Sequence, residues 1–120
     1  MKEIIDVTGL AKGGPYSHAN LTENLIFVSG QTGQIAGKET TFSQQFENAM
    51  KKIESILRSS GSSLGNVVKA SIYMKRKDDF KIMNDLFGKY FAKNPPTRTT
   101  LIVSFVADDI LVEIDVIASK

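Results

Sequence analysis

The sequence predicts an α+β fold, with a single mixed β-sheet of about six strands and two helices on one face. The chain has 120 residues, which is enough for one domain over 1–120 and too few for a second core. Two segments repeat apolar residues at helical spacing, and the segments around them are short, apolar and alternating. The predicted order is three strands, a helix, a strand, a helix and two strands.

The N-terminal third predicts short strands separated by glycine-rich loops. Met1–Val7 favours a short edge strand, and Leu25–Ser29 favours a strand that ends at Gly30. Gln31–Thr41 contains two further glycines and is interpreted as a loop or hairpin.

The segment Phe42–Ser60 gives the clearest prediction, an amphipathic helix. Its apolar side chains fall at positions 42, 46, 49, 50, 53, 56 and 57. Thr41 and Gln44 fit a capping box, in which each side chain satisfies a free backbone N–H of the first turn. Gly61 supplies the left-handed stop.

The C-terminal half predicts the remaining elements. Val67–Met74 alternates as a strand, Asp78–Phe91 has helical spacing, and Pro95-Pro96 prevents its continuation. Arg98–Phe105 and Leu111–Ile117 are the last two strands. The alternation in the first of these segments groups Val68, Ala70, Ile72 and Met74 on one face.

Two helices can cover only one face of this sheet, so the other face is open. In the last strand, Val112, Ile114 and Val116 suit the covered face. The open face is predicted to mix apolar and charged side chains, namely Phe27, Arg98, Thr100, Ile102, Leu111, Glu113, Asp115 and Ile117. An exposed apolar patch of this kind marks an interface, which predicts a homo-oligomer packed through this face. The alternative is a solvated sheet with a few stray apolar residues.

The composition limits the available chemistry. There is no cysteine and one histidine, His18, so thiolate zinc sites, Cys nucleophiles and paired-histidine sites are excluded. The net charge is +2, which argues against a nucleic-acid partner. No apolar run approaches the ~20 residues of a membrane span, and the N-terminus lacks a signal-peptide pattern. The expectation is a soluble cytoplasmic protein with no membrane association.

Arg98 and Glu113 are the strongest candidates for chemistry. Arg98 follows two prolines at a strand start, and its planar fork suits a carboxylate or phosphate. Glu113 lies between apolar residues and can orient or deprotonate a water molecule. The alternative is a structural ion pair between them.

Four further positions are weaker candidates. Asn84 falls within an apolar helical stripe and needs a hydrogen-bond partner, either a ligand or nearby backbone. Tyr16 lies in a loop, where it either donates to a ligand or packs on the core. Ser29-Gly30 ends a strand, where a glycine lets a ligand approach the backbone. His18 is interpreted as a structural, hydrogen-bonded histidine.

Taken in order, these segments resemble the RidA family, also called YjgF/YER057c/UK114, over nearly the whole chain. The residues of the resemblance are Gly14-Pro15-Tyr16-Ser17, Val28-Ser29-Gly30-Gln31, Gly61-Ser62-Ser63-Leu64, Val67-Val68-Lys69, Asp79-Phe80 with Asn84, Tyr90-Phe91, Pro95-Pro96-Thr97-Arg98 and Val112 to Ala118.

The resemblance implies a chorismate-mutase-like protomer and a homotrimer, in which three sheets form a central barrel with ligand clefts between subunits. In the arginine-bearing branch it implies hydrolysis of reactive 2-imino acids, made by PLP-dependent dehydratases, to 2-keto acids and ammonia without metal or organic cofactor. The positions that match the family's functional residues are Tyr16, Ser29, Gly30, Asn84, Arg98, Thr100 and Glu113.

The resemblance also implies roles for these residues. Arg98 and the Thr100 backbone N–H bind the substrate carboxylate, Glu113 positions water, Tyr16 and Ser29-Gly30 line the pocket, and Asn84 holds its rim. The sequence departs from the family pattern in having Thr100 where cysteine is frequent, in His18 and in a short 32–41 loop. These departures leave the preferred substrate open.

Two other functions remain open at this stage. The first is the endoribonuclease activity attached to some family members, which the low net charge does not favour. The second is a non-catalytic trimer that binds small ligands or unfolded clients. The presence of both Arg98 and Glu113 favours catalysis, because binding alone requires only the arginine.

Overall fold

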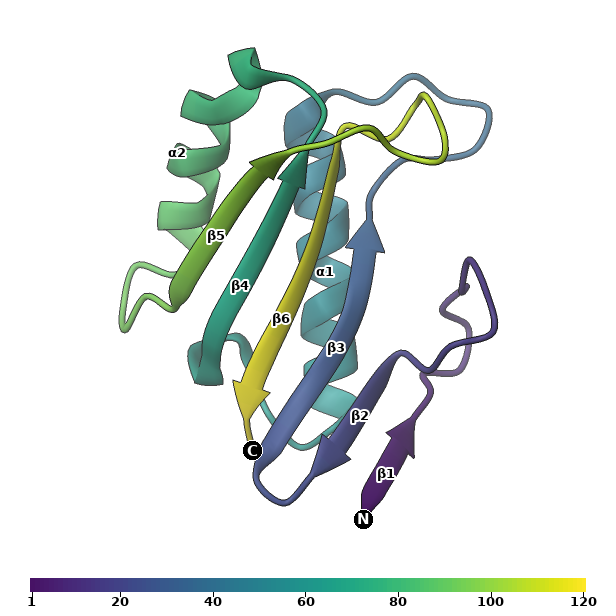
Figure 1. The fold of residues 1–120 in the computed structure, drawn as a ribbon, viewed down its shortest axis with the longest axis vertical. Helices are drawn as coiled ribbons and strands as arrows, with labels where there is room; N and C mark the ends of the chain where they lie inside the picture. Colours follow the sequence, from purple (N-terminus) through teal and green to yellow (C-terminus); the bar gives the residue numbers. More distant parts are fainter.

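The computed structural model describes all 120 residues and contains one six-stranded sheet with two α-helices on the same face (Figure 1). The predicted α+β class and element order are confirmed. The elements are β1 (Lys2–Ile5), β2 (Ala19–Thr22), β3 (Leu25–Thr32), α1 (Phe42–Ser59), β4 (Val67–Met74), α2 (Phe80–Tyr90), β5 (Thr97–Ile102) and β6 (Val112–Ser119). Short 3-10 turns at Leu64–Asn66 and Lys77–Asp79 precede β4 and α2.

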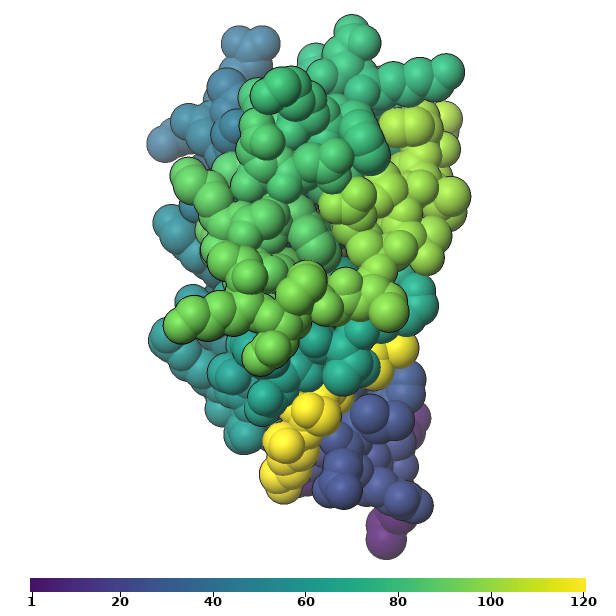
Figure 2. Space-filling view, turned by 90° about the vertical axis from the view of Figure 1, so that its left-hand side faces the viewer, coloured from purple at the N-terminus to yellow at the C-terminus, as the bar shows by residue number.

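The sheet has the strand order β1-β2-β3-β6-β4-β5. All neighbouring strands are antiparallel except β4 and β5, which are parallel and are joined through α2. The two edges are therefore the short β1 and the longer β5. Figure 2 looks onto the β5 side of the molecule, where α2 and β5 lie next to each other at the surface.

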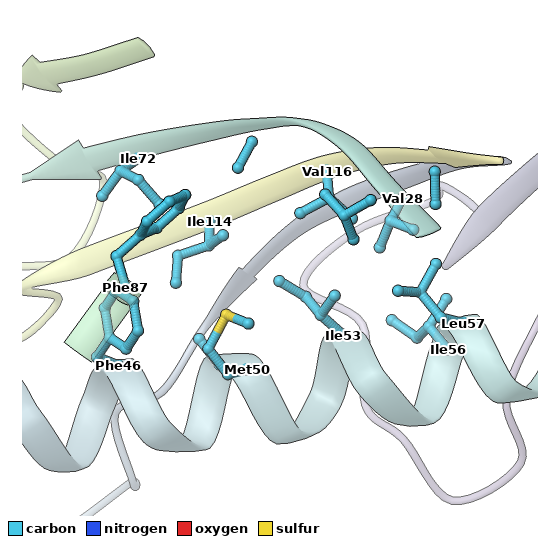
Figure 3. Close-up of a cluster of buried hydrophobic side chains, with 14 of the residues drawn as sticks. Val28, Phe46, Met50, Ile53, Ile56, Leu57, Ile72, Phe87, Ile114 and Val116 are labelled. Atoms are coloured by element: carbon cyan, nitrogen blue, oxygen red, sulfur yellow. The ribbon is translucent and has the colours of Figure 1, made fainter. Parts of the chain in front are cut away.

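The core lies between α1, α2 and the covered face of the sheet. Along α1 the fully buried side chains include Met50, Ile53 and Leu57, which face Val28 and Ile114 of the sheet (Figure 3). Removing these side chains from water supplies most of the force that holds the helix on the sheet. Neither helix is long and apolar enough to cross a membrane.

The ends of α1 follow the predicted signals. The Gln44 N–H donates to Thr41 Oγ1 at 3.2 Å, and the Thr41 N–H donates to Gln44 Oε1 at 2.9 Å, which completes the capping box. Gly61 follows the helix with φ of 80°, the left-handed geometry that glycine adopts without steric cost.

The loop alternative for Gln31–Thr41 is confirmed from residue 33 onward. Three local predictions need correction. The strand Ala19–Thr22 was not expected. The helix expected from Asp78 begins at Phe80, after the 3-10 turn. Val68 lies outside the core and is 47 % exposed, because a bulge between Val67 and Lys69 shifts the pairing of β4 with β6.

The predicted side for Arg98 is wrong. Arg98 lies opposite Ala70 in β4, and Ala70 is fully buried on the helix-covered face. Glu113 lies opposite Tyr73, whose side chain projects from the other face. Thr100 and Ile102 alternate with Arg98 and share its covered side. A direct Arg98–Glu113 ion pair within one chain is therefore excluded, and none is present.

Gly33 fixes the distance between the end of β3 and α1. A Cβ atom at Gly33 would overlap the backbone carbonyl group of Gln45. The added methyl group would meet the backbone of Gln45, which cannot move aside as a flexible side chain can. We therefore expect Gly33→Ala to lower the free energy of unfolding by at least about 2 kcal/mol. Denaturant unfolding measures this loss. Gly65→Ala is the matched control and should stay within about 0.5 kcal/mol of wild type, because its nearest neighbour would be an ordinary contact. Equal stabilities for the two variants would contradict the prediction.

Candidate functional site

The seven predicted site residues form two groups that are well separated on one chain. Tyr16, Ser29, Gly30 and Glu113 line one hollow where β3 and β6 meet the surrounding loops. Arg98 and Thr100 lie on the edge strand β5, and Asn84 lies on α2, the helix that contacts Arg98. We call the first group the glutamate hollow and the second group the arginine edge.

The glutamate hollow exists because β3 is longer than β2. The last β2–β3 pair joins Ala19 to Val28, so the remainder of β3 has no strand on that side. A bulge between Val28 and Gln31 turns Gly30 toward Glu113. The hollow has a volume of about 740 Å³, opens to solvent, and is bordered by the loop around Gly13 and the turn at 106–110.

Hydrogen bonds order the wall of the glutamate hollow. Ser29 Oγ donates to the Ser17 carbonyl at 2.7 Å, and the Ser29 N–H donates to the His18 carbonyl at 2.9 Å. The Tyr16 hydroxyl accepts from the Gly13 N–H at 3.0 Å and keeps its own proton available. Tyr16 is exposed, so it can donate to a bound group.

Glu113 projects over Gly30 inside this hollow. A Cβ atom at Gly30 would overlap the Glu113 carboxylate, so only glycine permits this approach. Burial raises the pKa of Glu113, and the nearby charge of Asp115 raises it further. A carboxylate in this setting holds a proton more readily than an exposed one, which suits a group that must take a proton from water.

The titration of Glu113 tests this environment. We expect carboxyl ¹³C NMR to place the midpoint of Glu113 above the ordinary pKa of a glutamate side chain. Asp115→Asn should lower the Glu113 midpoint, because it removes the negative charge that favours the protonated form. A midpoint that stays the same or rises in this variant would contradict the assignment.

Two groups in the glutamate hollow extend what the sequence indicated. His18 is buried and its Nδ1 accepts from the Val7 N–H at 2.9 Å, which confirms its structural role and places its proton on Nε2. That Nε2 is buried without a partner. Lys52 of α1 also lines the hollow, where Nζ donates to the Thr32 carbonyl at 2.8 Å, and burial lowers its pKa. Nothing in the helical pattern of α1 distinguished Lys52 from its other polar positions.

At the arginine edge, uncharged side chains surround the guanidinium of Arg98. Its Cζ lies 4.9 Å from the ring centroid of Phe87 and 5.9 Å from that of Phe80. Nη1 lies 3.6 Å from the sulfur of Met83. No carboxylate lies within 4.0 Å of the guanidinium. The cation has stacking partners and no counter-ion.

The other two residues of the arginine edge differ in exposure. Asn84, expected within the apolar stripe, is exposed and needs no internal partner, because the buried positions of α2 are Met83 and Phe87. Thr100 Oγ1 is buried without a hydrogen-bond partner. Leu101 and Ile102 follow on β5 with about half of their surface exposed, at 49 % and 47 %. The free edge of the sheet at β5 therefore has exposed apolar side chains next to an unpaired cation.

No group of three or more His, Asp or Glu side chains is arranged to hold a metal ion. The polar groups available for chemistry include the Glu113 carboxylate, the Arg98 guanidinium, the Tyr16 hydroxyl and backbone N–H donors, beside Lys52 and the Nε2 of His18 in the glutamate hollow.

The fold and the two groups of polar residues define a class of small α+β proteins with polar side chains at a sheet edge and in a surface hollow. The chain belongs to the RidA family (YjgF/YER057c/UK114), since the family model described as endoribonuclease L-PSP matches residues 8–120.

Curated relatives span most of the chain. It is 35 % identical to a RutC family protein of Pyrococcus horikoshii, covering 100 % of this chain and 99 % of the relative. It is 37 % identical to the chloroplastic Reactive Intermediate Deaminase A of Arabidopsis thaliana, over 88 % of this chain and 59 % of the relative. It is 30 % identical to the human 2-iminobutanoate/2-iminopropanoate deaminase, over 88 % and 80 % of the two chains.

Solved structures agree with the architecture. The yeast protein YEO7 superposes with a TM-score of 0.91 at 28 % identity, covering 100 % of this chain and 99 % of that chain. A member of the YjgF/YER057c/UK114 family from Mycobacterium tuberculosis superposes with a TM-score of 0.85 at 25 % identity, covering 100 % of both chains.

Proposed function

We propose that the protein hydrolyses 2-imino acids, including 2-iminobutanoate and 2-iminopropanoate, to 2-keto acids and ammonia, and that it acts as a homotrimer with active sites between subunits. The observation that supports this most is the position of Arg98 and Glu113 on opposite faces of the sheet, two strands apart, with each side chain facing away from the other. One chain cannot bring them together on a small substrate. The arginine edge of one subunit placed against the glutamate hollow of the next would do so.

The surface chemistry favours such an assembly. The free β5 edge exposes apolar side chains, and the open face has Phe27 opposite Ile117 on neighbouring strands. Burying both surfaces between copies removes apolar area from water and excludes water around the unpaired guanidinium. Charge interactions strengthen in a cleft of this kind.

The proposed reaction uses Arg98 and Thr100 to bind the substrate and Glu113 to activate water. Arg98 binds the substrate carboxylate through two parallel hydrogen bonds, assisted by the Thr100 backbone N–H. An enamine becomes the imine when its β carbon gains a proton from solvent and its nitrogen loses one to solvent. Glu113 then takes a proton from water as the water oxygen bonds to the imine carbon, and the C=N π electrons move to the nitrogen, which takes a proton from solvent. Glu113 returns its proton to the amine of the resulting carbinolamine, and the C–N bond breaks as the hydroxyl proton passes to solvent, which releases ammonia and the keto acid.

The remaining residues would shape this cleft. Tyr16 and the Ser29-Gly30 backbone line the wall beside Glu113. Asn84 is exposed beside the arginine edge and is available for the rim. The relatives whose names record deaminase activity, at 37 % and 30 % identity, support the same chemistry.

A coupled assay tests the proposal. A PLP-dependent threonine or serine dehydratase generates the imino acid, and the appearance of keto acid is followed with and without the protein. We expect the protein to accelerate keto-acid release, and sedimentation at micromolar concentration to give about three times the 13.2 kDa chain mass. No acceleration would reject the deaminase assignment, and a monomer would reject the shared site. Single-stranded RNA is the control substrate, and its cleavage by both wild type and Arg98→Ala would instead favour ribonuclease activity.

A further inference from the structure

The side chain of Arg98 lies in a slot made only of uncharged groups. The slot consists of Phe80, Met83 and Phe87, which occupy one side of α2 at spacings of three and four residues. Phe87 and Met83 are buried in the core, whereas Phe80 is 44 % exposed. Core packing does not account for this exposed position of Phe80. Its ring instead covers the guanidinium of Arg98.

This slot holds a cation without using its hydrogen-bond donors. Aromatic faces attract a guanidinium through the ring quadrupole, and they accept none of its in-plane N–H groups. A carboxylate neighbour would instead accept two of these donors and would have to be displaced by an incoming substrate. The single contact to sulfur is a weak acceptor interaction. The guanidinium of Arg98 is therefore held in one orientation, and its N–H donors remain free to bind a ligand.

We propose that Phe80 is a positioning residue for carboxylate binding, acting through Arg98. This inference rests on the proposed function for its catalytic readout and has a binding readout independent of it. Phe80 forms the outer wall of the slot, and Phe87 the inner wall. Loss of the outer wall releases the guanidinium to many side-chain conformations, so each binding event must order it again.

The test compares Phe80→Leu with Phe80→Tyr. We expect Phe80→Leu to raise KM about threefold to tenfold, with kcat within about twofold of wild type. Phe80→Tyr keeps an aromatic face and should restore the wild-type KM. Ile82→Leu is the matched control, since Ile82 is equally exposed at 45 % and, two residues from Phe80 on α2, lies on a different side of the helix from the slot. Sedimentation of each variant shows whether the oligomer is retained.

A second measurement separates this inference from the proposed function. Calorimetric binding of 2-oxobutanoate, a keto-acid product, should weaken about threefold to tenfold in Phe80→Leu and recover in Phe80→Tyr. If wild type binds the keto acid without accelerating imine hydrolysis, the deaminase proposal fails and the positioning role is judged on binding alone. Equal KM and equal keto-acid affinity in Phe80→Leu and wild type would overturn the positioning role. Absence of keto-acid binding by wild type would overturn it as well.

Discussion

Replacing Arg98 with alanine is expected to abolish the acceleration of imine hydrolysis while leaving the fold intact. The guanidinium has no internal counter-ion, so its loss breaks no ion pair. The substrate carboxylate would lose two charge-assisted hydrogen bonds. This corresponds to about 3 kcal/mol or more, and kcat/KM should fall at least about a hundredfold. The dehydratase-coupled assay measures the fall, and circular dichroism checks the fold.

Arg58→Ala is the matched control for the loss of an arginine. Arg58 lies in the last turn of α1, and its side chain is 73 % exposed in an ion pair with Glu54. We expect full activity in this variant, because surface ion pairs contribute about 0–1 kcal/mol to stability. Wild-type activity in Arg98→Ala would remove the carboxylate-binding role from the mechanism.

Local signals in the sequence were sufficient for the helices and for the fold class. The apolar repeat and the Thr41–Gln44 capping box place α1 to within one residue, because both depend on groups less than two turns apart. Ala19–Thr22 was missed because four residues are too few to show alternation above background. The bulge at Val68 depends on pairing with β6, which the local pattern does not contain.

The side on which Arg98 lies could not be derived from its own strand. Alternation separates a strand into two sets of side chains and does not say which set the helices cover. In β6 the apolar set identifies the covered side, whereas β5 has polar and apolar residues in both sets. The α2 crossover sets the parallel register between β5 and β4, and this register places Arg98 on the covered side. The sequence therefore placed Arg98 and Glu113 on the same face of the sheet, whereas the register places them on opposite faces.

Several contacts of the candidate site involve residues far apart in the chain. Gly30 meets Glu113 only through the β3–β6 pairing, and Lys52 reaches the glutamate hollow from α1. Phe80 and Phe87 flank Asn84 at helical spacing, which was the one available signal for the slot. This spacing indicated a stripe of core residues and not a slot around the guanidinium of Arg98, because periodicity does not show which group an aromatic ring faces.

Mixed trimers of two inactive variants are expected to regain activity. Arg98→Ala and Glu113→Gln each remove one half of the proposed shared site. In a ring of three copies, each site takes its arginine from one subunit and its glutamate from the next. A trimer that contains both variants, in either ratio, then has one interface with both residues intact. Chains with different tags, co-expressed and purified through both tags, should show about one third of wild-type activity.

The matched control co-expresses two differently tagged copies of Arg98→Ala, which should remain inactive. Inactive mixed trimers with a correct sedimentation mass would mean that both residues serve the same chain. That outcome would require β5 to move around the edge of the sheet, against the parallel pairing of β4 and β5 that runs from Lys69 to Met74. Recovery to about one third has a simpler cause. The sheet keeps the guanidinium and the carboxylate apart in one chain, and a neighbouring copy supplies the missing half.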